Sequence, residues 1–167
     1  AVSLTDLLDM VPVDACRYFF NAKPETQMEF DLGLAVREDS ENPVYYVQYA
    51  HARICTLLKN LAADGHTVPS PDTVDFSLLT DPTELALIKQ IAGYSDIVRL
   101  AARDYDPSFI NRYLTDLAAA FHKFYNACRI KGEAEDLLNA RLLLADTARS
   151  VLKNGMELIG CSAPDKM

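Results

Sequence analysis

The sequence lacks several features that mark out whole classes of protein. No apolar run approaches the roughly 18 residues of a membrane-spanning helix, so no membrane partner is expected. The first residues show no basic segment followed by an apolar one, which argues against a secretory signal. The glycines are scattered singly, so a glycine-rich phosphate loop is absent. An initiator Met is also missing, which indicates a processed chain or a fragment.

Cysteine and histidine residues show no spacing typical of a metal site. The cysteines are far apart and form no Cys-x-x-Cys pair, which predicts reduced core thiols in a cytoplasmic protein. No histidine is paired with a second ligand by spacing, so neither a metal nor another cofactor is predicted. No Ser/His/Asp or Cys/His set can be assigned either, and catalysis by this chain is not expected. The residues concerned are Cys16, Cys55, Cys128, Cys161, His51, His66 and His122.

The formal net charge of −8 is unfavourable for binding a polyanion. Its distribution is uneven, because residues 1–41 carry three basic against nine acidic groups. Residues 82–167 carry eleven of each sign. The acidity therefore belongs mainly to the first segment and leaves room for an RNA contact elsewhere.

Apolar residues recur at helical spacing through most of the chain. Asn42-Pro43 is typical of a helix start, and that helix is expected to reach residue 63. Similar signals predict helices over 82 to about 104, with a weak point at Gly93, then 107–131 and 133–158. Residues 65–81 are expected to form a loop. Four long amphipathic helices predict an all-α bundle.

Residues 4–41 are the least regular part of the chain. Helical spacing predicts a short helix over residues 4–11, stopped by Pro12, and another that ends before Pro24. Residues 28–32 alternate apolar and acidic side chains, which predicts a short extended piece. The segment has too little apolar mass to fold alone, so we interpret it as the tail of another domain.

Two segments combine polar and aromatic residues, and each allows two interpretations. In residues 42–53, Tyr45 and Tyr49 share one helix face. They either bury their rings in a core or form a surface that stacks unpaired bases. In residues 113–129, His122 and Asn126 lie away from the apolar stripe. They belong either to a solvated face or to the same RNA-reading surface.

These segments resemble a known family. Residues 42–54, Asn-Pro-Val-Tyr-Tyr-Val-Gln-Tyr-Ala-His-Ala-Arg-Ile, resemble the start of the anticodon-binding domain of bacterial arginyl-tRNA synthetases, which are class I enzymes. Residues 113–126 resemble the later motif of this domain, called DALR, and residues 140–145 and 152–167 its closing helix and terminus. Residues 1–41 resemble the stretch after the family's Lys-Met-Ser-Lys loop. The resemblance implies a small mixed remnant of the catalytic domain over 1–41 and a DALR-type helical bundle over 42–167.

The resemblance implies that the chain binds the anticodon loop of tRNA(Arg) and contacts the remainder of the synthetase in the cytoplasm, with no DNA partner. The family's His-Ile-Gly-His and Lys-Met-Ser-Lys motifs have no counterpart here. The chain alone is therefore not expected to ligate arginine to tRNA, the reaction for which the parent uses ATP and magnesium. An alternative is a helical interaction or oligomerisation module without RNA binding. The tRNA-binding residues carried over by motif are Asn42, Tyr45, Tyr46, Gln48, Tyr49, His51, Arg53, Phe121, His122, Tyr125, Asn126 and Met167.

Overall fold

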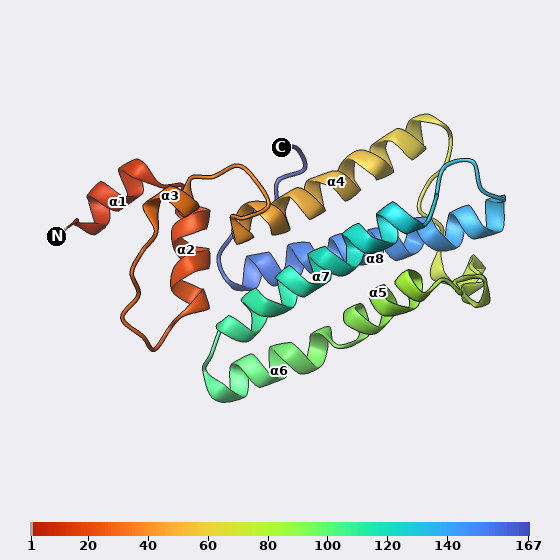
Figure 1. Cartoon of the computed structure of the whole chain (residues 1–167). Coiled ribbons are helices and arrows are strands. Elements are labelled where there is room, and N and C mark those ends of the chain that lie inside the picture. Colours follow the sequence, from red (N-terminus) through yellow and green to blue (C-terminus); the bar gives the residue numbers. More distant parts are fainter. Residues whose placement is uncertain (1) are drawn as a thin grey trace.

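A computed structural model describes residues 2–167, and all regular secondary structure in that range is helical (Figure 1). The prediction of an all-α protein is therefore confirmed. No helix in residues 2–167 is both long enough and apolar enough to cross a membrane. The helices are α1 (Leu4–Met10), α2 (Val13–Ala22), α3 (Leu32–Ala35), α4 (Pro43–Ala63), α5 (Pro82–Ala92), α6 (Tyr94–Asp104), α7 (Ser108–Ala127) and α8 (Glu135–Leu158), with short 3-10 turns η1 (Pro71–Thr73) and η2 (Phe76–Leu78).

Helices α4 and α5 start where their capping residues predict. The side chain of Asn42 accepts a hydrogen bond from the backbone N–H of Val44 (3.3 Å), and Pro43 occupies the first turn. Asp81 and Glu84 form a reciprocal capping box at the start of α5. These local hydrogen bonds satisfy backbone donors that a helix start leaves free.

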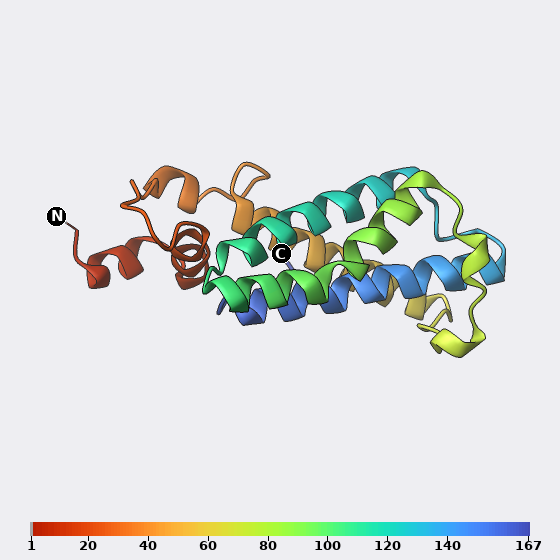
Figure 2. The ribbon, with the colours of Figure 1, turned by 90° about the horizontal axis from the view of Figure 1, so that it is seen from below.

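Helix α7 lies at the centre of the bundle and packs against α4, α5, α6 and α8. Helix α4 covers one side of the α7–α8 pair, while α5 and α6 cover the other (Figures 1 and 2). The core between them contains the fully buried rings of Phe121 and Phe124. The side chains on the outer face of α4 are therefore free for another role.

Two of the predicted long helices are shorter than the apolar pattern suggested. The predicted helix over 82–104 is divided at Gly93 into α5 and α6. Helix α7 ends at Ala127, because Cys128 takes an extended conformation (φ −113°, ψ 114°). The extended backbone lets both Cys128 and Ile130 turn into the core, where each is 4% exposed. Burial of these side chains thus overrides the helical periodicity.

The amino-terminal segment is helical or irregular and contains no strand within residues 2–41. The expected mixed remnant is not observed, since residues 28–31 have no partner strand there. Asp31 instead caps α3 by accepting from the N–H of Leu34 (2.9 Å). The segment is tied to α7, because Tyr18 donates its hydroxyl to the Asn111 carbonyl (3.1 Å) and receives the Asn111 amide on its own carbonyl (2.9 Å). The boundary at residue 42 stays a prediction.

Candidate nucleic-acid interface

A surface hollow of about 380 Å³ lies between α4 and α7, and we call it the aromatic hollow. Helical spacing puts Tyr45, Tyr49 and Arg53 on one face of α4, since residues four apart are neighbours on a helix. His122 and Asn126, which are also four apart, face them from α7. Apart from Ser40, all the lining residues were expected from the sequence: Tyr45, Tyr46, Tyr49, Arg53, His122 and Asn126.

The tyrosine rings of the aromatic hollow form a stacking platform. The rings of Tyr45 and Tyr49 are nearly parallel, at 8°, with centroids 6.2 Å apart. Tyr49 is 40% exposed. The ring of Tyr46 packs against His122 with centroids 5.2 Å apart. Exposed aromatic faces of this kind stack unpaired nucleic-acid bases.

Arg53 is held in the aromatic hollow by rings rather than by a carboxylate. Its guanidinium lies 4.2 Å from the centroid of the Tyr125 ring and 5.9 Å from that of Tyr49. In residues 2–167, no acidic side chain forms an ion pair with it. Because arginine stays charged at any ordinary pH, the hollow keeps an uncompensated positive charge with free N–H donors.

His122 adds a neutral hydrogen-bonding group. Burial, and then the nearby charge of Arg53, lower the pKa of His122 below its ordinary value. Its Nδ1 lies 3.4 Å from the Arg53 guanidinium, which can only donate. The proton of the neutral ring is therefore on Nε2, available as a donor. The hollow thus offers aromatic faces and N–H donors, a combination that suits an unpaired base.

The other predicted residues lie outside the aromatic hollow. Asn42 is 3% exposed and donates its amide to the carbonyl of Arg37 (2.8 Å) while capping α4. Phe121 is fully buried, and its position in the core accounts for its spacing. Gln48 and His51 face the carboxyl-terminal tail. A binding role for these side chains stays a prediction.

The carboxyl-terminal tail, residues 159–167, crosses α4 and is held there by hydrogen bonds. Gln48 donates to the Ser162 carbonyl (3.0 Å), and His51 Nδ1–H donates to the Pro164 carbonyl (3.0 Å). The carbonyl of Gly160 accepts from Arg17 on α2 (2.7 Å). Met167, 52% exposed, ends this tail. The tail therefore has a defined path beside α4.

Comparison with known proteins identifies the family. The model of the DALR anticodon binding domain matches residues 47–167. The chain belongs to this family. Tyr49, Arg53 and the α7 side of the aromatic hollow lie within the matched range, whereas Tyr45 and Tyr46 precede it.

Two relatives that match the whole chain are both named arginine–tRNA ligase. Arginine–tRNA ligases of Acetivibrio thermocellus and Ruminiclostridium cellulolyticum are each 48% identical over 168 residues, covering 100% of this chain and 30% of the relative. The solved structure of Thermus thermophilus arginyl-tRNA synthetase has a TM-score of 0.79 and 29% identity, covering 95% of this chain and 27% of that one. The chain thus spans about 30% of the length of these curated relatives.

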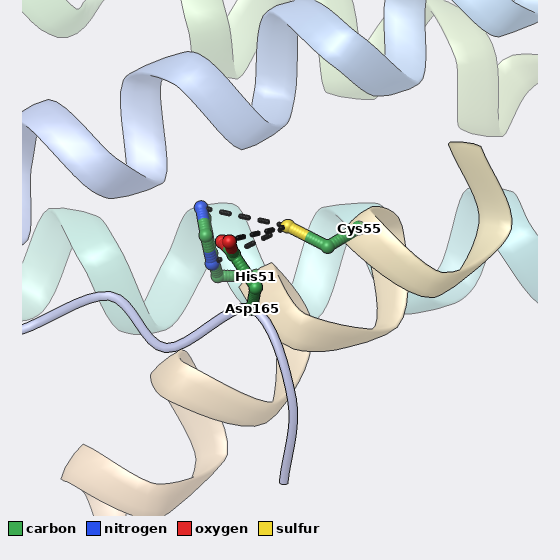
Figure 3. Close-up of side chains that lie close together, drawn as sticks. All are labelled: His51, Cys55 and Asp165. Carbon is green, nitrogen blue, oxygen red and sulfur yellow. Dashed lines mark hydrogen bonds between the residues drawn. The ribbon is translucent and has the colours of Figure 1, made fainter. Parts of the chain in front are cut away.

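Apart from the aromatic hollow, the structure brings together the side chains of His51, Cys55 and Asp165. Their potential metal-ligand atoms all lie within 4.8 Å of one another (Figure 3). The separation of four residues between His51 and Cys55 on α4 was a signal in the sequence that we did not use, whereas Asp165 comes from the distant tail. Imidazole, thiolate and carboxylate are donors that zinc accepts. The Cys55 sulfur, however, is 3.7 Å from Nδ1 and 3.9 Å from Nε2 of His51. The Nδ1–H of His51 already donates to the Pro164 carbonyl, which leaves Nε2 as the ring nitrogen that could bind a metal.

The observed hydrogen bonds instead join the tail to α4. Burial, followed by a hydrogen bond to Asp165, raises the pKa of Cys55 to about 11. The thiol is therefore protonated at neutral pH and donates to the carboxylate of Asp165 (3.5 Å). Of the four cysteines predicted to lie in the core, Cys16, Cys128 and Cys161 are buried, whereas Cys55 is only partly buried. That this group functions without a metal stays a prediction.

Proposed function

We propose that the chain binds the anticodon loop of tRNA(Arg) by taking an unpaired base into the aromatic hollow. The observation that carries this proposal is the nearly parallel pair of the half-buried Tyr45 and the exposed Tyr49 beside Arg53, which has no carboxylate partner in residues 2–167. Membership of the DALR family and the name of the relatives support an anticodon loop of tRNA(Arg) as the target.

The proposal accommodates the acidic composition. Reading a splayed base by stacking and by hydrogen bonds to its edge needs few phosphate contacts, so the net charge of −8 does not prevent binding. In this proposal the chain is the RNA-reading part of a longer cytoplasmic arginine–tRNA ligase. ATP, magnesium and the chemistry of ligation belong to the rest of that enzyme.

An interaction module without RNA binding is the less favoured alternative. Its support is a group of exposed apolar side chains on the amino-terminal segment, which includes Leu4 (64% exposed) and Phe20 (48% exposed). These residues line a hollow with Phe30 and Leu32. The surface lies away from α4 and α7, so it is compatible with RNA binding. We assign it to contact with the remainder of the synthetase.

Filter binding with tRNA(Arg) transcripts that carry substituted anticodon-loop bases tests the proposal. The chain is expected to discriminate between these transcripts at moderate salt. The substitution Tyr49→Ala should remove one stacking face and weaken binding by about 1–3 kcal/mol. Tyr105→Ala is the matched control, because Tyr105 is 92% exposed at the end of α6 and should leave binding unchanged. Equal affinity for every transcript would contradict specific recognition.

A further inference from the structure

A second hollow, of about 390 Å³, lies where the carboxyl-terminal tail passes between α4 and α8. Three basic side chains from three separate elements line it: Lys59 of α4, Arg149 of α8 and Lys166 of the tail. We call it the basic hollow. Such convergence stands out in a chain with a net charge of −8, and the anticodon-reading residues do not account for it.

The acidic groups nearby are already engaged. Asp146 pairs with Arg149 at 2.7 Å, which leaves the rest of the guanidinium fork free. The carboxylate of Asp165 accepts from Cys55 and turns toward His51 (Figure 3). Lys59 and Lys166 are exposed, and in residues 2–167 neither forms an ion pair. Neither ammonium group therefore forms an ion pair, and the three basic side chains outnumber the one carboxylate, that of Asp165, among the residues that line the hollow.

The two hollows lie on different faces of α4, since ten residues of helix leave Tyr49 and Lys59 about 80° apart around the axis. Lys59 follows Tyr49 by ten residues, which corresponds to about 15 Å along the helix axis. A stacked nucleic-acid strand advances roughly 3.4 Å per nucleotide, so about four nucleotides cover this distance. Both side chains are exposed, and the tail passes Gln48 and His51 before Lys166 lines the basic hollow with Lys59. One RNA strand can therefore reach both hollows if it also turns around α4 as it advances.

From this arrangement we infer that the basic hollow binds a backbone phosphate of the RNA whose base enters the aromatic hollow. The inference rests on the proposed function. Lysine ammonium groups bind a phosphate as point charges, while arginine adds N–H donors in a planar fork. Such a contact carries no base information and positions the strand. It also gives the ordered tail a role, because the tail presents Lys166 beside Arg149.

The salt dependence of tRNA(Arg) binding tests this inference. In the double variant Lys59→Gln/Lys166→Gln, affinity should fall roughly three- to tenfold for the native transcript and for a transcript with a substituted anticodon loop alike. The slope of log K against log salt should decrease by about 0.7 for each single-strand phosphate that the variant no longer neutralises. Circular dichroism should show unchanged helix content, because both side chains are exposed.

The matched control is Lys23→Gln/Lys89→Gln, which removes the same charge from exposed positions on α5 and at the end of α2. It should retain the wild-type slope. If the wild-type chain discriminates between transcripts while the Lys59/Lys166 variant keeps the wild-type slope and affinity, the phosphate site is refuted and the proposed function stands. If the wild-type chain binds no transcript, both fail.

Discussion

The Glu84–Arg141 pair and the aromatic hollow each contain an arginine, and they differ in how their polar atoms are satisfied. Between α5, α7 and α8, the carboxylate of Glu84 is fully buried and accepts from Arg141 (2.6 Å) and from the N–H of Asp81 (2.9 Å). Arg141 also donates to the carbonyl of Arg129 (2.5 Å). We call this group the Glu84–Arg141 corner.

The arginine of the aromatic hollow, Arg53, differs from Arg141 because it has no carboxylate partner in the described part of the chain. Tyr49 is 40% exposed, and Arg53 lies over tyrosine rings with no carboxylate partner among residues 2–167. A buried polar group must be paired because leaving it unpaired costs free energy. An exposed group with spare donors is free to bind a ligand. Residue type alone therefore does not distinguish a structural corner from a binding surface, whereas hydrogen-bond satisfaction does.

The largest effect is expected from Glu84→Ala, which breaks the Glu84–Arg141 corner. Arg141, whose side chain is 13% exposed, would keep a largely buried charge without its main partner. Breaking a buried pair in this way costs about 3–5 kcal/mol, to be measured as the free energy of unfolding in urea. Glu157→Ala, at an exposed position on α8, is the control. A loss below about 1 kcal/mol would show that the corner is not structural.

A smaller effect, on binding rather than folding, is expected from Arg53→Met. Methionine keeps an apolar stem against Tyr125 but removes the charge and the donors. Affinity for tRNA(Arg) should fall by about 1–3 kcal/mol, with the free energy of unfolding changed by less than about 1 kcal/mol. Arg99→Met on the exposed face of α6 is the control. If Arg53→Met lost stability but kept its affinity for tRNA(Arg), Arg53 would be a structural residue rather than a binding residue.

The smallest effect is the pH dependence contributed by His122. Its pKa in the folded chain is lowered from 6.5 by burial and by Arg53, so protonation favours the unfolded chain. This contribution to stability is present above pH 6.5 and is lost as the pH falls through the folded-state pKa. Urea unfolding between pH 7.5 and 5 should show a smaller loss of stability for His122→Gln. Arg53→Met should also reduce that loss, because it removes the positive charge that repels a protonated His122. If Arg53→Met and the wild-type chain lose the same stability between these pH values, Arg53 does not lower the pKa of His122.

Much of the fold was predictable because it depends on contacts within a few residues. Caps at Asn42 and Asp81 and the helical period of apolar residues located α4 and α5. The end of α7 was not predictable in this way, because the extended backbone at Cys128 turns Ile130 into the core, whereas a continued helix would point Ile130 away from it. The absence of a strand at residues 28–31 has the same origin, since a strand needs a partner.

In the candidate site, too, the features that depend on one helix were predictable, and those that depend on packing between helices were not. Spacing on single helices grouped Tyr45 with Tyr49 and His122 with Asn126, and motif resemblance carried them over as candidates. The sequence left the choice between core and surface open for them, and it did not separate them from Asn42 and Phe121. Only the packing of α4 against α7 buries Phe121 while leaving Tyr49 exposed.

By itself, then, the sequence determined the helices, the family resemblance and the residue types available for RNA binding, because these depend on local hydrogen bonds and on motif. The tertiary structure decided which side chains are open and which distant ones meet. Asp165 approaches Cys55 across 110 positions of sequence, and Lys166 approaches Arg149 beside it. Such meetings depend on the path of the tail over α4, and no short-range pattern encodes that path.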